Sequence, residues 1–175
     1  MGMLKKSFIA IILCAVLPCC VLAETITDKG IQQVSVFFSP RGGCSVAIVK
    51  ELDAAQTEIL LQAYSFTSEP IAKALLAAKK RGVTVKVILD KSQRTQKYSA
   101  YTFLKNQGIP VYIDAAHAIA HNKIIIIDQE TVITGSFNFT KAAEEKNAEN
   151  LLIVKSKELT NLYTSNWNKH KEHSE

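Results

Sequence analysis

Residues 121–138 read HNKIIIIDQETVITGSFN, and this stretch decides the fold. Its run of four isoleucines is typical of a strand that is buried on both faces. The segment 131–134 has the pattern of a second short strand, and a turn at Asp128-Gln129 would join the two. The stretch therefore predicts a hairpin within a sheet, so the sheet is mixed rather than purely parallel.

Polar side chains flank this predicted hairpin. Side chains at positions i and i+2 of a strand point to the same face. His121 therefore projects together with Lys123, and Ser136 projects together with Asn138. If the strands pair through the turn, both polar pairs converge at one edge of the sheet, and Gly135 lets another backbone approach closely.

This set of side chains suits a phosphoryl group. An imidazole such as that of His121 can act as a nucleophile or as an acid and base. A lysine ammonium, a hydroxyl and an amide are the donors expected around phosphoryl oxygens. No carboxylate cluster that could hold two metal ions accompanies them. The sequence therefore predicts phosphodiester chemistry without a metal ion or another cofactor.

Strands and helices alternate through the first two thirds of the chain outside the N-terminal segment. The expected strands are 33–38, 58–64, 83–89, 111–113, 123–127, 131–134 and 151–154. The expected helices are 46–55 with Ser45 as its N-cap, 68–80 before Gly82, 98–106, and a last helix with Leu159, Leu162, Tyr163 and Trp167 on one face. This alternation predicts an α/β fold with a mixed, mostly parallel sheet and helices on both faces.

The first residues have the pattern of an export signal. Lys5 and Lys6 precede an apolar run, and Val21-Leu22-Ala23 is a small-residue site of the kind that signal peptidase cleaves. We therefore expect residues 1–23 to be a signal peptide, or an N-terminal anchor if retained, in a periplasmic or secreted protein. Residues 24–175 then form a single domain.

Charge and cysteine content exclude little about the partner. The net charge of the chain is +5, and it falls to +3 without the two lysines of the N-terminal segment. This charge is compatible with a polyanionic substrate and equally with an ordinary soluble surface.

Cys44 is the single cysteine after residue 23, which excludes an internal disulfide and a cysteine-based zinc site in that part of the chain. Lipidation at Cys19-Cys20 is disfavoured by the preceding Leu17-Pro18.

The stretch 121–138 resembles the His-x-Lys-x4-Asp-x6-Gly-Ser-x-Asn motif of the phospholipase D superfamily at every defined position. The likeness to the small bacterial Nuc-type endonucleases of that superfamily extends over most of residues 24–175. It includes AYSFT at 63–67, KKRGV at 79–83, GSFNFT at 135–140 and NxEN at 147–150.

The resemblance implies a role for each motif residue. His121 would attack phosphorus and form a covalent phosphohistidine, while Lys123 and Asn138 bind the non-bridging oxygens with Ser136 close by. Glu149 matches a carboxylate that orients the histidine in these nucleases. Asp128 is expected to be hydrogen-bonded behind the site rather than to take part directly.

A second motif histidine protonates the leaving oxygen in this family, but the chain contains one motif. His117 does not begin another, because Ile119 stands where the lysine should be. Two chains must therefore share a site, and we expect a homodimer with its two-fold axis through the active site.

Other readings of the polar residues are weaker. His117 and His121 have the i, i+4 spacing of helical metal ligands, but they precede a strand and no third ligand is evident. His170 and His173 fall in a polar segment where we expect solvation. A Ser136-His121-Asp128 triad lacks the Gly-x-Ser-x-Gly elbow.

The loop 39–43 and the aromatic residue Tyr64 each have a structural and a functional interpretation. The loop 39–43 precedes a helix but lacks a P-loop lysine, which favours a plain turn. Tyr64 could line the cleft or be buried.

Three functions remain open at this stage. The first is an exported, metal-independent endonuclease that acts on DNA and perhaps on RNA. The second is a phospholipase acting on lipid headgroups, with membrane contact if residues 1–23 are retained. The third is a non-catalytic nucleic-acid-binding module, which the complete motif disfavours. The absence of long insertions that could form a lipid-binding surface favours the nuclease.

Overall fold

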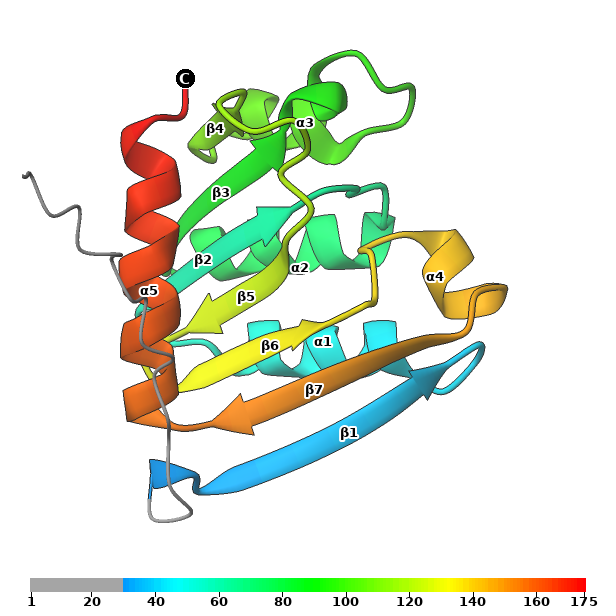
Figure 1. Cartoon of the computed structure of the whole chain (residues 1–175), viewed down its shortest axis with the longest axis vertical. Coiled ribbons are helices and arrows are strands. Elements are labelled where there is room, and N and C mark those ends of the chain that lie inside the picture. Colours follow the sequence, from blue (N-terminus) through cyan, green and yellow to red (C-terminus); the bar gives the residue numbers. More distant parts are fainter. Residues whose placement is uncertain (1–29) are drawn as a thin grey trace, which may run out of the picture.

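The computed structural model describes residues 30–175 (Figure 1). Its strands are β1 (Gln33–Ser39), β2 (Glu58–Ala63), β3 (Thr84–Asp90), β4 (Val111–Asp114), β5 (Lys123–Ile127), β6 (Thr131–Gly135) and β7 (Glu149–Lys155). Its helices are α1 (Cys44–Ala54), α2 (Glu69–Lys80), α3 (Ala100–Asn106), α4 (Lys141–Glu145) and α5 (Lys157–Glu172), with a short 3-10 helix, η2 (Lys91–Arg94). The strands form one sheet in the order β1-β7-β6-β5-β2-β3-β4.

The sheet is mixed and carries helices on both faces, as predicted. β2 pairs with β3, and β3 with β4, in parallel. The other neighbouring pairs are antiparallel. Among the described strands, only the β2–β3 and β3–β4 pairs are parallel, so the expectation of a mostly parallel sheet is wrong. The reason is that helical crossovers join these three strands, whereas β5, β6 and β7 follow one another through connections that reverse the chain.

Apolar side chains form a core on each face of the sheet. On one face, α1, α2 and α3 cover the strands with buried residues that include Ile48, Leu52, Leu75 and Leu104. On the other face, α5 crosses the strands, and Trp167 packs against Leu60, Ile88, Ile124 and Ile126. The indole Nε1 of Trp167 donates a hydrogen bond of 3.1 Å to the carbonyl of Leu61. This contact confirms the predicted inward face of the last helix at its central residue.

Helix α1 begins one residue before Ser45, so the predicted N-cap is wrong. The N-cap is Gly43, with a left-handed φ of 80°. A carboxylate from α4 does the capping, because Glu144 accepts hydrogen bonds from the backbone N–H of Gly43 at 3.1 Å and of Ser45 at 2.7 Å. An acidic group at these amides leaves no anion site there, which supports the interpretation of loop 39–43 as a plain turn.

The C-terminal histidines are not simply solvated, which corrects another expectation. The side chain of His170 is 16% exposed, and its Nδ1 lies 2.7 Å from Oδ2 of the fully buried Asp114. The cause is that α5 continues to Glu172 and brings its last turn against the end of β4.

The expected signal segment 1–23, with its three cysteines, lies outside the described residues. Cys44 is a buried free thiol, and burial together with the nearby Glu144 raises its pKa to about 11. Such a thiol is unreactive at neutral pH. Within residues 30–175, no helix has the length and apolar character needed to cross a membrane.

Candidate active site

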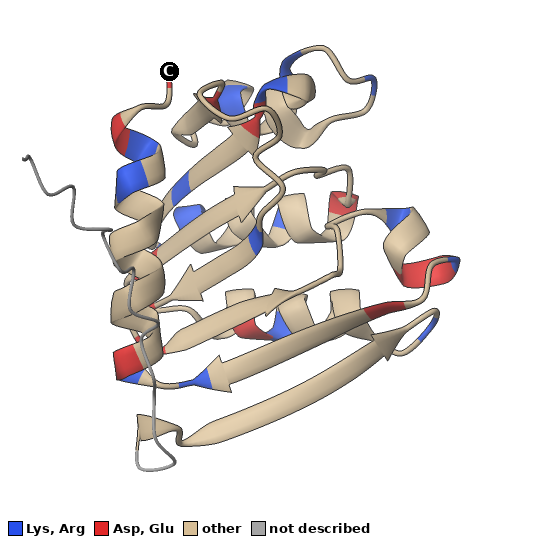
Figure 2. Cartoon of the chain, in the orientation of Figure 1, with Lys and Arg blue, Asp and Glu red and all other residues tan. Residues whose placement is uncertain are grey.

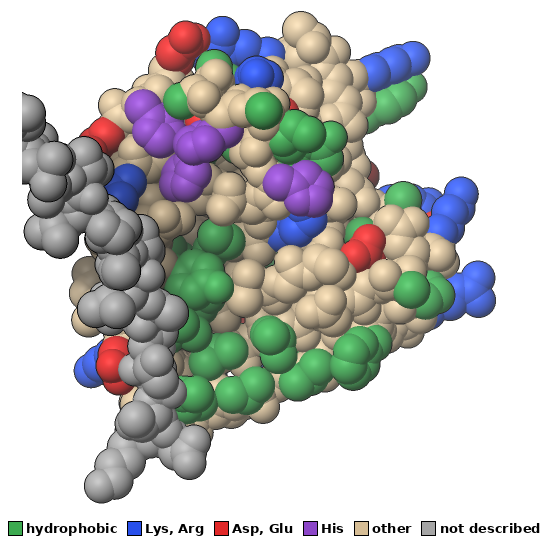
Figure 3. Space-filling view, viewed as in Figure 1, with side chains coloured by type: hydrophobic (Ala, Val, Ile, Leu, Met, Phe, Trp, Pro, Cys, Tyr) green, Lys and Arg blue, Asp and Glu red, His purple; other side chains and the backbone are tan. Residues whose placement is uncertain are grey.

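The predicted hairpin forms and gathers the polar side chains at the end opposite its turn. Ile125 lies opposite Ile133 in the antiparallel β5–β6 pair, and Asp128 and Gln129 have φ values of 54° and 56° in the turn. One cavity of about 410 Å³ is lined by His121, Lys123, Gly135, Ser136, Asn138 and Glu149. In the space-filling view, histidine side chains stand in two separate places on the face that α5 crosses (Figure 3).

His121 and Lys123 are in contact, as their spacing predicts. The Nζ of Lys123 donates to the carbonyl of His121 at 2.9 Å and lies 3.2 Å from the Nδ1 atom of the same residue. Tyr64 follows β2 and packs beside them, with 4.6 Å between its ring centroid and that of His121. Tyr64 therefore lies at the site, which settles the alternative left open from the sequence.

Lys123 is a buried cation beside an exposed imidazole. Lys123 is 7% exposed, and this burial lowers the pKa of its ammonium. The negative charge of Glu149 acts in the opposite direction and raises the pKa, but by less. Among residues 30–175, Lys123 forms no salt bridge. Charged residues are sparse along the central strands (Figure 2). The ammonium is therefore available to an anionic ligand, and Glu149 is the one carboxylate in the lining of the same cavity.

Gly135 lets β7 approach the end of β6, as expected. A Cβ at this position would lie 2.2 Å from the carbonyl oxygen of Asn150, and the φ of 148° is one that side chains rarely adopt. The same carbonyl accepts hydrogen bonds from the backbone N–H groups of Ser136 at 3.1 Å and of Phe137 at 3.3 Å. The close approach thus fixes the backbone that carries Ser136 and Asn138.

Glu149 contacts Ser136 rather than His121. Its Oε2 accepts a hydrogen bond of 2.6 Å from the Ser136 hydroxyl, and its Oε1 accepts one of 3.1 Å from Asn147. The Ser136 hydroxyl also accepts from the N–H of Asn150 at 3.0 Å. Within one copy, the carboxylate therefore positions the serine.

Asn138 reaches the cavity between two buried aromatic residues. Phe137 and Phe139 are 0% and 1% exposed and anchor the segment in the core. The side-chain amide of Asn138 forms no hydrogen bond with the described part of the chain, and its Oδ1 is buried. A polar group held in place without a partner is suited to a ligand.

Asp128 lies away from the cavity, at the opposite end of β5. Its carboxylate accepts hydrogen bonds of 2.8–3.0 Å from the backbone N–H groups of Gln56, Thr57 and Glu58, and from the Thr57 hydroxyl. It follows Lys123 by five positions along the strand, a distance of about 17 Å. The placement matches the expected structural position and excludes the Ser136-His121-Asp128 triad.

One buried residue of the site was not predicted. Gln62, in β2, is 1% exposed, and its Nε2 donates a hydrogen bond of 3.1 Å to the side chain of Asn122. It thereby holds the residue between His121 and Lys123. The available signal was a polar side chain inside the otherwise apolar strand EILLQA.

Comparison with known proteins identifies the family. A family model described as cardiolipin synthase, PLD-like domain, matches residues 48–171. The phospholipase D of Rickettsia typhi is 44% identical over 143 residues, which cover 82% of this chain and 70% of that protein.

Two solved structures share the fold. Nuc, a phospholipase D family member from Salmonella typhimurium, is 42% identical with a TM-score of 0.78, over 82% of this chain and 96% of that one. NucT from Helicobacter pylori is 27% identical with a TM-score of 0.76, over 81% and 97%. The family predicted from the motif is confirmed: the chain belongs to the phospholipase D superfamily, whose enzymes hydrolyse phosphodiester bonds.

Proposed function

We propose that this protein is an exported endonuclease that hydrolyses DNA, and RNA as a second substrate, without a metal ion at the reacting phosphate. The observation that carries the proposal is the single cavity lined by His121, Lys123, Ser136 and Asn138. It combines a nucleophile with a cation and neutral donors. Glu149 is the one carboxylate in its lining, and its oxygens are taken by Ser136 and Asn147.

The first step forms a covalent intermediate. An unprotonated ring nitrogen of His121 attacks phosphorus, and the bond from phosphorus to the leaving nucleoside oxygen breaks. The protonated His121 of a second copy gives its proton to that oxygen. Lys123 and the amide of Asn138 hold the non-bridging oxygens, where negative charge accumulates.

The second step restores the enzyme. The imidazole that gave up its proton now takes one from a water molecule, whose oxygen attacks phosphorus. The phosphorus–nitrogen bond breaks, and a phosphomonoester leaves. Both histidines thus return to their starting states, and no metal ion is needed to balance the reaction.

A second copy is required because, among the described residues, one chain supplies only His121 to the cavity and the reaction uses two histidines. An apolar surface on the same face supports its docking. The β1 surface (Val34, Val36 and Phe38) is 48%, 51% and 65% exposed. Strand register places these side chains on the α5 face, where hydrophobic side chains line the lower strands (Figure 3). The site opens beside α5, because His121 and Lys123 also line a hollow together with Leu162 and Tyr163. A two-fold axis on this face would bury the β1 surface and bring the two cavities together.

Nucleic acid is the proposed substrate because the chain carries a net charge of +5 and nucleic acid is a polyanion. The competing proposal is lipid headgroup hydrolysis, which the phospholipase D name of the Rickettsia typhi relative favours. The exposed β1 surface would then contact lipid rather than a second copy.

One assay separates these functions. The purified chain is incubated with plasmid DNA, RNA and phosphatidylcholine vesicles in a single buffer that contains excess EDTA. We expect DNA cleavage without release of choline, and loss of cleavage in His121→Asn and Lys123→Gln. Lys50→Gln, at an exposed position of α1, is the matched control and should cleave normally. Choline release that exceeds DNA cleavage would favour the lipase, and activity lost in EDTA but restored by magnesium would contradict the mechanism.

The covalent intermediate has its own test. A phosphohistidine is labile in acid and more durable in alkali. A reaction with labelled substrate quenched in alkali should leave label on His121 and none on His121→Asn. Label on Ser136 would contradict the proposal.

A further inference from the structure

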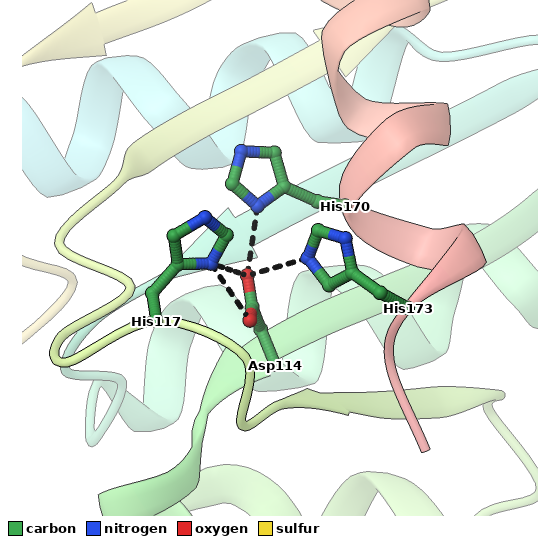
Figure 4. Close-up of side chains that lie close together, drawn as sticks. All are labelled: Asp114, His117, His170 and His173. Atoms are coloured by element: carbon green, nitrogen blue, oxygen red, sulfur yellow. Dashed lines mark hydrogen bonds and ion pairs between the residues drawn. The ribbon is translucent and has the colours of Figure 1, made fainter.

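Four potential metal ligands meet at the C-terminal end of α5, outside the candidate active site. The Asp114 cluster (Asp114, His117, His170 and His173) combines the last residue of β4, a residue of the following loop, and the end of α5 (Figure 4). One ligand atom of each residue lies within 4.8 Å of all the others. The imidazoles point inward to a single carboxylate (Figure 4).

The contacts of Asp114 are hydrogen-bond and ion-pair distances that a tetrahedral metal ion would also accommodate. Asp114 Oδ2 lies 2.7 Å from Nδ1 of His170 and 3.5 Å from Nε2 of His173. Asp114 Oδ1 lies 3.0 Å from Nδ1 of His117. Ligands about 2.0–2.1 Å from a tetrahedral zinc ion are separated from one another by about 3.3 Å, a value within this range.

The distances between the three imidazole rings also fit a shared metal ion. The ring centroids are 4.9 Å apart for His117 and His170, 5.1 Å for His117 and His173, and 5.3 Å for His170 and His173. Three imidazoles on one tetrahedral zinc ion have centroids about 5 Å apart, because each centroid lies about 3 Å from the metal. Hydrogen bonding to a carboxylate does not by itself require three rings to be equally spaced.

We propose that the Asp114 cluster is a structural zinc site. Three imidazole nitrogens and one carboxylate oxygen would fill all four positions of a tetrahedral ion, which suits a structural zinc ion rather than a catalytic one. Asp114 is fully buried, and backbone contacts already hold its surroundings in place. Its Oδ1 accepts from the N–H of Ala116, and Ile113 exchanges backbone hydrogen bonds with Glu175 in both directions.

The site would tie α5 to the loop that leads into the active site. His117 lies four residues before His121. The loop is anchored on both sides of this histidine: Lys91 donates to the carbonyl of His117 at 3.0 Å, and the N–H of Ala120 donates to Asp90 at 2.8 Å. Zinc would add a link between the loop and α5, and so stabilise the loop without touching the reacting phosphate.

Zinc binding is tested on the purified full-length chain with any polyhistidine tag removed. The protein is stripped with EDTA, exchanged into buffer, and dialysed to equilibrium against micromolar zinc, and its metal content and unfolding temperature are measured. We expect one zinc ion per chain and a rise in unfolding temperature. His170→Ala and His173→Ala should lower zinc affinity by at least about 100-fold, since even outer-shell partners contribute 10–100-fold.

Controls locate the ion. His121→Ala should keep its zinc, which excludes binding at the candidate active site. Cobalt in place of zinc should give the visible bands of a tetrahedral site without a thiolate charge-transfer band, which excludes the cysteines. His173 is 38% exposed at the end of α5, so His173→Ala tests the site with little risk to folding. Wild-type protein without bound zinc, or zinc lost in His121→Ala and kept in His173→Ala, would overturn the proposal.

Discussion

The hydroxyl of Ser136 donates a 2.6 Å hydrogen bond to Oε2 of Glu149, so these two site residues act as a unit. Ser136 sits just after β6 and Glu149 begins β7, and the N–H of Asn150 completes the arrangement by donating to the same hydroxyl. Neither side chain can be removed without changing the environment of the other.

We expect Ser136→Ala and Glu149→Gln to be non-additive. Each single change should lower kcat, because each leaves the other side chain without its partner close to Lys123. The double variant should lose less activity than the product of the two single losses, with a coupling of about 0.5–3 kcal/mol. A double-mutant cycle on DNA cleavage measures the coupling, and independent effects would show that the contact has no role in catalysis.

Asp128 should govern acid stability rather than activity. Burial opposes its ionisation, but hydrogen bonds from Glu58, Gln56 and Thr57 outweigh this and lower the pKa of the carboxyl. A lowered folded-state pKa contributes stability that is present above the unfolded value near 4 and is lost as the pH falls through the folded value. Asp128→Asn should therefore lower the free energy of unfolding by about 1–3 kcal/mol at pH 7. It should also flatten the fall in unfolding temperature between pH 5 and pH 2.

The measurement for Asp128 is a series of thermal unfolding scans across this pH range. Asp53→Asn, at the exposed end of α1, is the matched control and should retain the wild-type profile. A fall of the same steepness in Asp128→Asn and wild type would assign the acid sensitivity to other carboxyl groups.

Gly135→Ala should disrupt the site more than a glycine substitution elsewhere. The added Cβ would meet the carbonyl oxygen of Asn150 at 2.2 Å, and that oxygen cannot move without breaking its bonds to the N–H groups of Ser136 and Phe137. Gly82→Ala is the control, because its φ of 95° is also unfavourable but nothing lies within 4 Å of the new Cβ. Gly82→Ala should cost about 1–3 kcal/mol of stability with normal kcat. Gly135→Ala should lose both stability and activity, and equal effects would argue against the close contact.

Mixed dimers test the shared site. Equal amounts of wild-type and His121→Ala chains are unfolded together and allowed to reassociate at random. About a quarter of the dimers are then fully wild type under two-fold pairing. Activity should fall to about a quarter of that of the same total concentration of wild-type chains, because a dimer with one histidine lacks either the nucleophile or the acid. About half would remain if each chain worked alone, provided that subunit exchange is complete.

Local pattern was sufficient for most of the fold. The isoleucine strand, its turn and the inward face of α5 were evident because burial and turn geometry leave a direct mark on neighbouring residues. Elements of four or five residues, such as η2 and α4, are too short to show a period. The N-cap of α1 was missed because Glu144, the group that caps it, lies about a hundred positions further along the chain.

In the candidate site, too, local contacts could be predicted from the sequence and long-range contacts could not. The i, i+2 spacing was enough to place His121 in contact with Lys123, and Ser136 and Asn138 in the lining of the same cavity. The contact of Glu149 with Ser136, and the meeting of His170 with Asp114, arise from the order of the strands, which no local spacing encodes. Long-range pairing is therefore where the sequence ceases to be informative.

The pairing of β1 with β7 also has a consequence for the timing of folding. Gln33 lies opposite Lys155 and Ser39 opposite Glu149, so the first described strand meets the last one. During synthesis, β1 emerges from the ribosome more than a hundred residues before the strand on which it docks. The growing chain must therefore wait with this edge of the sheet unformed, and such late, non-local pairing slows folding.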